Sequence, residues 1–405
     1  MPGSEPIGGP APVDGVLPAS ARRRLGASHF GVYVHVPFCA TRCGYCDFNT
    51  YTAAELGTGG STAAYVQAAL AEVRLARRVL EDARLPVSTV FFGGGTPTLL
   101  PVPDLARLLR AIDAEFGLEP DAEVTVEANP ESVDPAYLAA LRGAGFTRLS
   151  VGMQSARPHV LAGLDRRHTP GRPEQCVRWA RDAGFGQVSL DLIYGGPGES
   201  IADWRASLDA AIGVGPDHVS AYALVVEDGT RLAARVRRGE LAAPQDDDLA
   251  DKYLLADERL TGAGLGWYEV SNWSRPGAQC RHNLGYWRSA DWWGIGPGAH
   301  SHVGGVRWWN VKHPRSYAAR LSEGDSPAQG RELLTVEDER IEQILLRLRL
   351  TTGVALAALA EVGRKAAAGA AADGLLDATA YAGGQAVLTR RGRLLADAVV
   401  RDLVD

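Results

Sequence analysis

Short apolar runs alternate with longer amphipathic segments from residue 31 to about residue 230. The amphipathic segments, such as 102–117 and 201–213, repeat their apolar residues every three or four positions, which is the period of a helix. Strands that alternate with helices pair in parallel, so six such units predict an α/β fold with an open or partial (β/α)6 barrel. The six predicted strands are 31–36, 88–92, 123–128, 147–152, 187–194 and 218–226.

The unusual residues of this region follow the predicted strands. Three cysteines come after the first strand, and glycine-rich or acidic segments come after the others. Since chemistry in such barrels takes place at the carboxyl ends of the strands, we expect all these corners at one rim. The later corners are 93–97, 127–131, 152–155, 191–199 and 227–230.

The pattern changes beyond Gly239. A helix is predicted within 240–262, and seven of the nine tryptophans lie between Trp267 and Trp309. Further helical patterns near the end, with one short strand, predict a small, mainly helical appendage of winged-helix type. The predicted organisation is a disordered lead-in (1–28), a partial barrel (29–239), a Trp-rich α/β extension (240–329) and a small C-terminal domain (330–405).

Composition narrows the class of partner. The chain is 46% hydrophobic and 22% charged, as in soluble globular proteins, and its net charge of −6 argues against nucleic acid as the main partner. The N-terminus lacks a secretory pattern, and no apolar stretch approaches the roughly 20 residues that span a bilayer. Five cysteines, an odd number with three clustered, favour a reducing compartment. We expect a cytoplasmic protein that binds a small molecule or another protein.

Cys39, Cys43 and Cys46 form the pattern C-x3-C-x2-C. A structural zinc site needs four ligands, and a second cysteine pair is missing because Cys176 and Cys280 are isolated. A redox pair would use two of the three cysteines and leave the first unexplained. An iron–sulfur cluster uses all three, and in a four-iron cluster it leaves one iron open to another ligand.

The cysteine pattern, with "GGGTP" after the second predicted strand, resembles the radical S-adenosylmethionine superfamily. Further segments resemble its oxygen-independent coproporphyrinogen oxidase-like group. The resemblance implies that the three cysteines hold a [4Fe–4S] cluster and that S-adenosylmethionine chelates the open iron. The segments are "YVHVPFCATRCGYCDF", "FFGGGTPTLL", "VTVEANPE", "SVGMQS", "LDLIYGGPGES" and "HNLGYW".

The resemblance also implies a set of residues around S-adenosylmethionine. Two of them, Glu127 and Asp191, have a structural alternative, because a buried carboxylate needs a partner that a salt bridge would also supply. The structural alternative for the glycines is a tight turn that contacts no ligand. Arg167 is an alternative to its neighbour Arg166 for the cofactor-binding position. The implied residues are Tyr33, Tyr45, Gly94, Gly95, Thr96, Glu127, Gln154, Arg166, Asp191 and Ala223.

Two observations bear on the function within that group. The resembling oxidases carry a fourth cysteine where this chain has Phe48, which favours the heme-chaperone branch. The segment H-N-x-x-Y-W resembles a motif associated with heme binding in that branch. It implies heme as ligand and a heme-acceptor protein as partner, with candidate contacts from Cys280, His282, Asn283, Tyr286 and Trp287.

Several alternatives stay open. The segment is also explained as a Trp-rich packing surface in which His282 only forms hydrogen bonds, and His300, His302 and His313 are rival ligands for heme iron. The activity can instead be oxidative decarboxylation of coproporphyrinogen III, or a radical reaction on another substrate.

Overall fold

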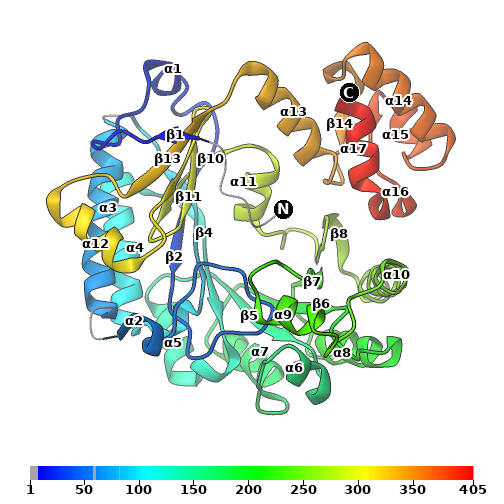
Figure 1. The fold of residues 1–405 in the computed structure, drawn as a ribbon, viewed down its shortest axis with the longest axis horizontal. Helices are drawn as coiled ribbons and strands as arrows, with labels where there is room; N and C mark the ends of the chain where they lie inside the picture. Colours follow the sequence, from blue (N-terminus) through cyan, green and yellow to red (C-terminus); the bar gives the residue numbers. More distant parts are fainter. Residues whose placement is uncertain (1–7, 58–60, 82, 405) are drawn as a thin grey trace.

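The computed structural model describes residues 8–57, 61–81 and 83–404, and its centre is a row of six parallel strands. The strands follow one another in sequence order and curve around an open interior (Figure 1). Their side chains are buried almost continuously, because helices cover the outer face. The partial (β/α)6 arrangement is therefore confirmed. The strands are β2 (Phe30–Val36), β3 (Val87–Gly94), β4 (Leu118–Ala128), β5 (Arg148–Gln154), β6 (Gln187–Tyr194) and β7 (His218–Ala223).

The connecting helices lie on the outside of this row (Figure 1). Two begin with a capping box, in which a Ser or Thr side chain and an acidic side chain three residues later satisfy the first backbone groups. The helices of this region are α2 (Ala53–Leu56), α3 (Thr62–Val79), α4 (Val102–Phe116), α5 (Pro135–Gly143), α6 (Pro158–Gly163), α7 (Arg172–Asp182), α8 (Ile201–Gly213), α9 (Arg231–Arg237) and α10 (Asp246–Gly262), with short 3-10 turns η2 (Pro97–Leu99) and η3 (Pro130–Ser132).

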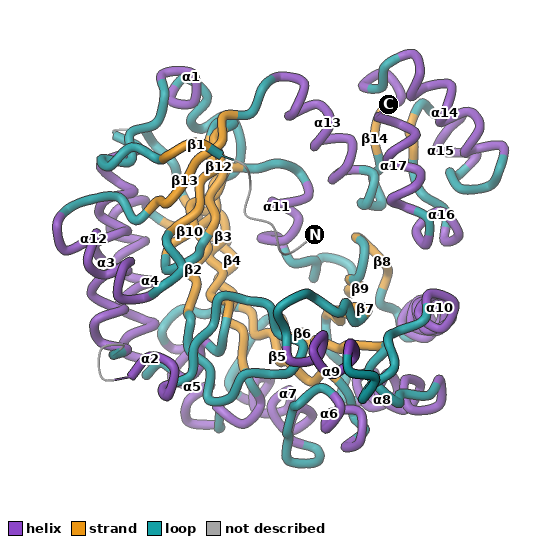
Figure 2. Tube along the Cα trace, viewed as in Figure 1, coloured by secondary structure: helices purple, strands orange, loops and turns teal. Residues whose placement is uncertain are grey.

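Strands from the Trp-rich region extend the barrel sheet at both edges (Figure 2). On one side β9 and β8 pair antiparallel with β7, and on the other β10 pairs parallel with β2. The extension is thus part of the same 13-stranded sheet as the barrel. Its elements are β8 (Gly266–Glu269), β9 (Asn272–Ser274), α11 (Arg281–Trp287), β10 (Asp291–Ile295), β11 (His300–Val303), β12 (Val306–Asn310), α12 (Pro314–Glu323) and β13 (Ala328–Leu333).

The N-terminal segment differs from the disordered lead-in expected from its composition. Residues 8–28 are packed, because β1 (Gly9–Pro10) pairs with β13 and α1 (Ala19–Arg22) places Ala21 in the core. Leu17 is also buried. Partners more than 300 residues away supply this order, so local composition carried no sign of it. Residues 1–7 of the predicted lead-in lie outside the described residues.

The C-terminal part has its own hydrophobic core, separate from that of the barrel. Its first helix starts after β13, which still belongs to the large sheet, so the small unit begins somewhat later than residue 330. An isolated bridge between Glu269 and Leu350 joins it to β8. Its elements are α13 (Val336–Arg347), β14 (Val354–Ala355), η4 (Leu356–Ala358), α14 (Glu361–Ala372), α15 (Ala378–Ala382), β15 (Gln385–Ala386), α16 (Arg390–Leu394) and α17 (Ala396–Val404).

A buried carboxylate joins the barrel to the extension. Glu72 of α3 accepts hydrogen bonds from the backbone N–H of Gly296 (2.8 Å), the side-chain amide of Asn310 (2.7 Å) and the hydroxyl of Tyr317 (2.5 Å). Burial nevertheless raises the pKa of Glu72 to about 7. The uncharged donors offset part of the free-energy cost of burying the ionised carboxylate, but not all of that cost.

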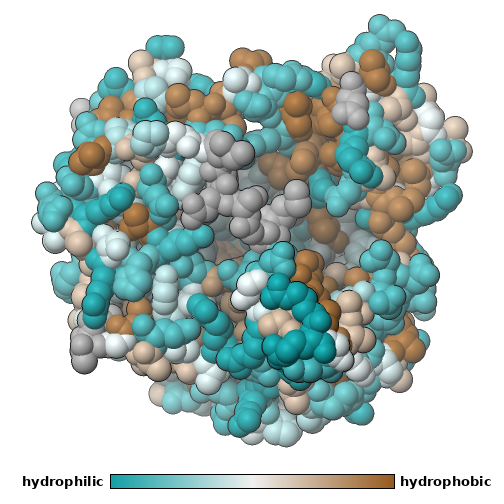
Figure 3. Space-filling view, in the orientation of Figure 1, coloured by the Kyte–Doolittle hydropathy of each residue, from teal (hydrophilic) through white to brown (hydrophobic). Residues whose placement is uncertain are grey.

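On the face shown in Figure 3, hydrophobic residues are interspersed with hydrophilic ones. Within the described residues, each helix is too short or too polar to cross a lipid bilayer.

Candidate functional site

One cavity of about 1820 Å³ runs from the carboxyl ends of the barrel strands into the barrel interior. It brings together segments that are far apart in the sequence, including the corner after β2 and the start of α11. Most of the predicted site residues line it: Cys39, Cys43, Tyr45, Cys46, Gly94, Gly95, Thr96, Glu127, Gln154, Arg166, Asp191, Ala223, Cys280 and Asn283. Four predicted residues are not part of this lining: Tyr33, His282, Tyr286 and Trp287.

The corner that carries the three cysteines, residues 39–46, is here called the cluster loop. Three hydrogen bonds hold its backbone. The N–H of Cys39 donates to the carbonyl of Tyr51 (3.0 Å), the N–H of Gly44 donates to the carbonyl of Leu164 (3.1 Å), and the carbonyl of Gly44 accepts from the N–H of Leu232 (2.8 Å). Just beyond the loop, the side chain of Asn49 donates to the carbonyls of Pro297 (2.9 Å) and Lys312 (2.8 Å). The loop is therefore fastened to both the barrel and the extension.

The three thiols are free and half-buried in the cavity wall. Burial raises the pKa of Cys39 and Cys46, and the neighbouring thiols add to the shift because their negative charges repel. The guanidinium of Arg166 donates to the sulfur of Cys43 (3.4 Å). The thiolates thus need positive charge beside them, which iron would provide.

Among the described residues, no group of three or more Cys, His, Asp or Glu side chains is placed to hold a single metal ion. This arrangement agrees with the chemistry of a cubane cluster, in which each thiolate binds a different iron. Three cysteines from one loop, facing a cavity large enough for a further ligand, fit a [4Fe–4S] cluster with one open iron.

The glycines after β3 are required by close packing within the protein. A Cβ on Gly94, whose φ is +106°, would lie 2.6 Å from the imidazole of His35, and one on Gly95 would lie 2.5 Å from the carbonyl oxygen of Phe38. The same backbone meets the start of the cluster loop, since the N–H of Thr96 donates to the carbonyl of Phe38 (2.7 Å). This packing gives the "GGGTP" segment a structural reason that is independent of any ligand.

Glu127 and Asp191 are half-buried near each other at the cavity wall, and neither forms a salt bridge among the described residues. Asp191 accepts from the hydroxyls of Ser150 and Ser220, both at 2.8 Å, and Glu127 accepts from the N–H of Gly94 (3.2 Å). Burial, reinforced by the charge of Asp191, raises the pKa of Glu127 to about 8. Burial also raises the pKa of Asp191, although the serine hydroxyls oppose it.

Arg166, the arginine implied for the cofactor site, is held by several hydrogen bonds. Besides Cys43, Arg166 donates to the carbonyl of Gly152 (3.1 Å) and to His168 (3.2 Å), while Arg167 is exposed at the cavity edge. Gln154, at the end of β5, has a φ of +65°, which is unusual for a residue other than glycine and turns the chain at the rim. These contacts favour Arg166 over Arg167 for the position facing a bound cofactor.

Tyr33 lies behind the cavity wall. Its hydroxyl donates to Nδ1 of His35 (3.0 Å), and its ring lies 6.3 Å from that of Phe91 and 6.4 Å from that of His282. Tyr33 therefore connects the strand before the cluster loop with α11.

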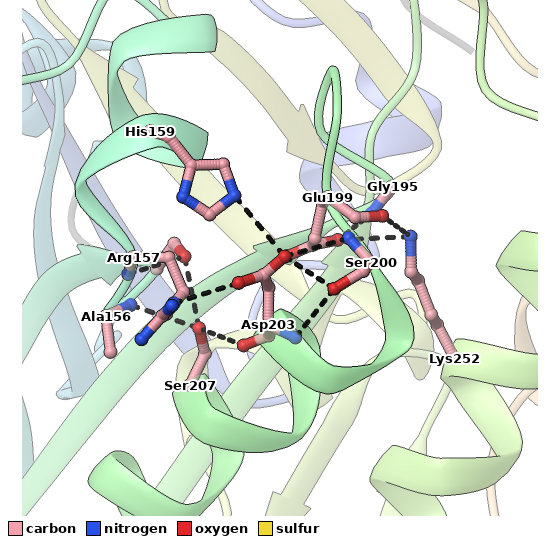
Figure 4. A network of polar contacts seen from close by, with 10 residues as sticks. Ala156, Arg157, His159, Gly195, Glu199, Ser200, Asp203, Ser207 and Lys252 are labelled. Atoms are coloured by element: carbon pink, nitrogen blue, oxygen red, sulfur yellow. Dashed lines mark hydrogen bonds and ion pairs between the residues drawn. The ribbon is translucent and has the colours of Figure 1, made fainter.

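The glycine-rich segment after β6 is fixed by a buried ionic network (Figure 4). Glu199 accepts from the N–H of Gly195 (2.6 Å) and lies 3.4 Å from the ammonium of Lys252, which is completely buried. The ammonium also donates to the carbonyl of Glu199 (2.9 Å) and to Asp248 (2.6 Å). Helix α10 therefore fixes the segment that follows β6.

The α11 segment presents some of its predicted heme contacts to the cavity and buries others. His282 is 3% exposed, and its ring nitrogens share hydrogen bonds with the hydroxyls of Thr89 (2.8 Å) and Tyr286 (2.8 Å). Its ring stacks on Phe91, and burial lowers the pKa of His282 to about 3. Here His282 forms hydrogen bonds within the core, while Cys280 and Asn283 face the cavity.

The rival histidines lie on other elements. His302 is buried and donates from Nδ1 to the carbonyl of Ala290 (3.1 Å), and His313 accepts from the N–H of Arg315 at the start of α12 (3.2 Å). His300 is exposed on β11, where it stacks on Trp309. These three histidines are not among the residues that line the cavity.

Sequence reasoning missed several residues that hold the predicted site residues in place. Glu123 accepts from the N–H groups of Arg281 and His282, both at 3.0 Å, and so fixes the first turn of α11. Ser150 and Ser220 hold Asp191 because β5 and β7 flank β6. The one available signal was polarity within otherwise apolar strands, and strand register was needed to interpret it.

Comparison with known proteins agrees with these features. The family model described as "Radical SAM superfamily" matches residues 33–211. The chain is 57% identical over 375 residues to "Heme chaperone HemW" of Mycobacterium tuberculosis, which covers 93% of this chain and 95% of that protein. It is 32% identical to the Bacillus subtilis protein of the same name, with 81% and 86% covered.

Among solved structures, coproporphyrinogen III oxidase (HemN) from Escherichia coli, described as a radical SAM enzyme, superposes with a TM-score of 0.80. The two chains are 22% identical, and the match covers 95% of this chain and 92% of that chain, which shows a common fold. The cofactors of the superfamily are a [4Fe–4S] cluster and S-adenosylmethionine, in agreement with the cluster loop and the cavity beside it. The chain belongs to the HemW family of the radical SAM superfamily.

Proposed function

We propose that this protein is a heme chaperone, which binds heme and transfers it to an acceptor protein while carrying a [4Fe–4S] cluster and an exchangeable S-adenosylmethionine. The observation that carries the proposal is the 57% identity, over 93% of the chain, to a protein named heme chaperone HemW. Free cysteines in the cavity wall fit a reducing compartment, which supports a cytoplasmic site of action.

The mouth of the cavity supports a large, flat, apolar ligand. Phe48, at the position where the oxidases carry a further cysteine, is 61% exposed and lines the mouth together with the exposed side chains of Tyr222 and Val225. Exposed apolar side chains that gather at one cavity are typical of a ligand site. Arg167 and Arg231 lie in the same lining and offer cations for acidic groups of the ligand.

We propose that α11 forms the inner wall of the heme site through Cys280 and Asn283. His282 is neutral, which is the form that binds a metal. To bind iron, it would have to exchange its hydrogen bond with Thr89 or with Tyr286. Tyr286 and Trp287 would then act by holding α11 in place.

The experiment is a hemin titration of the purified protein, followed by gel filtration. We expect a Soret band that saturates at one heme per chain and elutes with the protein. His282→Ala should weaken the band, whereas His29→Ala, at an exposed position outside the cavity, should leave it unchanged. Absence of saturable binding above that of a non-specific control protein would refute the proposal.

The oxidase alternative predicts a different result. With cluster, S-adenosylmethionine and an electron donor supplied, an oxidase converts coproporphyrinogen III, whereas a chaperone leaves it unchanged. Rapid conversion would make the enzyme the better description. Formation of 5′-deoxyadenosine stimulated by some other compound would point to a different radical reaction.

A further inference from the structure

A buried arginine without an acidic partner lies at the inner end of the cavity. Arg148 is the first residue of β5 and is 2% exposed, yet it is among the residues that line the cavity. Its guanidinium donates from Nη1 to the side-chain oxygen of Gln187 and to the carbonyl of Ala278 (2.9 Å). Among the described residues, no carboxylate lies within ion-pair distance of it.

This situation differs from that of one other buried cation and one half-buried cation of the chain. The ammonium of Lys252 lies beside both Glu199 and Asp248, and the guanidinium of Arg393 donates two hydrogen bonds to Asp257. A buried charge without a counter-charge is costly, and neutral carbonyl acceptors offset only part of that cost. An anionic group of a ligand would complete the set of partners around Arg148.

The surroundings of Arg148 are polar and fixed by hydrogen bonds. His218 shares hydrogen bonds with Ser189 (2.7 Å) and with the hydroxyl of Tyr268 (2.8 Å), which in turn accepts from the N–H of Cys280 (3.3 Å). Ser189, His218 and Cys280 line the cavity beside Arg148. Burial keeps the pKa of His218 well below its usual value, so this histidine is neutral and the positive charge beside it is that of Arg148.

The position of Arg148 also relates it to α11. The carbonyl that it holds, that of Ala278, lies two residues before Cys280, and Asn283 lines the same cavity one turn further along. A ligand that contacts these two side chains therefore lies close to the guanidinium. Two acidic groups of the wall, Asp191 and Glu127, are held by serine hydroxyls and by a backbone N–H. Burial raises the pKa of Asp191 and the charge of Arg148 opposes this rise, but the two groups do not form an ion pair.

We propose that Arg148 binds a carboxylate group of the ligand that occupies the inner part of the cavity. The inference rests on the proposed function, and for heme the group is one of the two propionates. Within the described part of the chain, the guanidinium donates only from Nη1, so its other N–H groups are available to a ligand, and arginine binds carboxylates through paired hydrogen bonds. Arg148 thus selects for the acidic edge of the macrocycle.

The test compares a porphyrin acid with its ester. Both compounds are free of metal, so binding to iron does not contribute to the difference. Protoporphyrin IX and its dimethyl ester are titrated into the full-length protein, with binding followed by quenching of tryptophan fluorescence. The wild type should bind the acid roughly 10- to 100-fold more tightly than the ester, as expected for loss of one charge-assisted contact. Arg148→Gln should remove most of this preference, and Arg167 and Arg231 account for what is left.

A matched variant separates the proposal from a purely structural role. Arg281→Gln removes a nearby guanidinium that pairs with Asp121 outside the cavity, and it should keep the preference of the wild type. If Arg148→Gln does not fold, Arg148→Lys retains the charge but loses the paired geometry, and its preference should fall at least threefold. An unchanged preference in either folded Arg148 variant overturns the proposal, because loss of loop anchoring alone affects acid and ester equally.

Failure of the inference about Arg148 can be distinguished from failure of the proposed function. A wild type that binds both porphyrins equally refutes the role of Arg148 but leaves the heme chaperone intact. A wild type that binds neither porphyrin nor hemin refutes the proposed function itself.

Discussion

Replacing Glu127 by Gln should weaken binding of S-adenosylmethionine in a pH-dependent way. Glu127 lies in the cavity wall, accepts from the N–H of Gly94 and has a pKa raised to about 8 by burial and by Asp191. At neutral pH most of the free protein therefore carries a protonated Glu127. A cationic or hydroxyl-bearing ligand that prefers the carboxylate must displace that proton.

The magnitude follows from this pKa. A hydrogen bond to an ionised group contributes about 1.5–3 kcal/mol, so above pH 8 the Gln variant should bind roughly 10- to 100-fold more weakly than the wild type. Below pH 8, each pH unit costs the wild type about 1.4 kcal/mol to ionise the carboxyl group, which is roughly a factor of ten. The ratio of the two dissociation constants should therefore approach one near pH 6.5.

The assay is an anaerobic titration of S-adenosylmethionine into cluster-reconstituted protein without a reductant, at pH 6.5 and pH 8.5. Titration of the ligand itself affects wild type and variant alike, so it cancels in their ratio. A ratio that is the same at both pH values, or a Gln variant that binds as tightly as the wild type at pH 8.5, would refute the assignment of Glu127 to this site.

Three further predictions concern the cluster and the packing. Ala at any one cluster-loop cysteine should abolish the EPR signal of the reduced cluster, whereas Cys176→Ala, at a buried position within α7, should retain it. Lys252→Ala should cost about 3–5 kcal/mol in urea unfolding by leaving the buried Glu199 unpaired, while the exposed Lys365→Ala should cost less than about 1 kcal/mol. The pKa of Glu72 is higher in the folded state, so its contribution to the free energy of unfolding is fully present below pH 4.5. About 3 kcal/mol of that free energy is lost as the pH rises from there through 7. Glu72→Gln should remove this pH dependence from the urea midpoint.

The barrel could be predicted because each of its strands contains a short apolar run that is mostly buried on both faces. For example, 187–194 was predicted as a strand from its residues alone, and β6 has these bounds. The strands of the Trp-rich region were harder, since their pairing with the barrel edges depends on contacts between distant segments. For the same reason β1 was not predicted, because its partner β13 is distant in the sequence.

The candidate site was predictable in its residue types and less so in their contacts. The pattern in the cluster loop indicated its chemistry directly, because cysteine spacing is local. The partners of Asp191 and of His282 depend on which strands lie side by side, so neither Ser150 nor Thr89 could be identified beforehand. Arg148 was missed because a charged residue at the start of a strand is ordinarily exposed.

The most direct test of the account is transfer of heme from the loaded protein to an acceptor. The heme-loaded protein is mixed with the apo form of a heme enzyme from the same organism, and loss of its Soret band is followed together with gain of the enzyme's activity. We predict that the enzyme gains one active site for each heme lost and gains it faster than from free hemin at equal concentration. Retention of heme by the loaded protein, or activation no faster than by free hemin, would contradict the chaperone function.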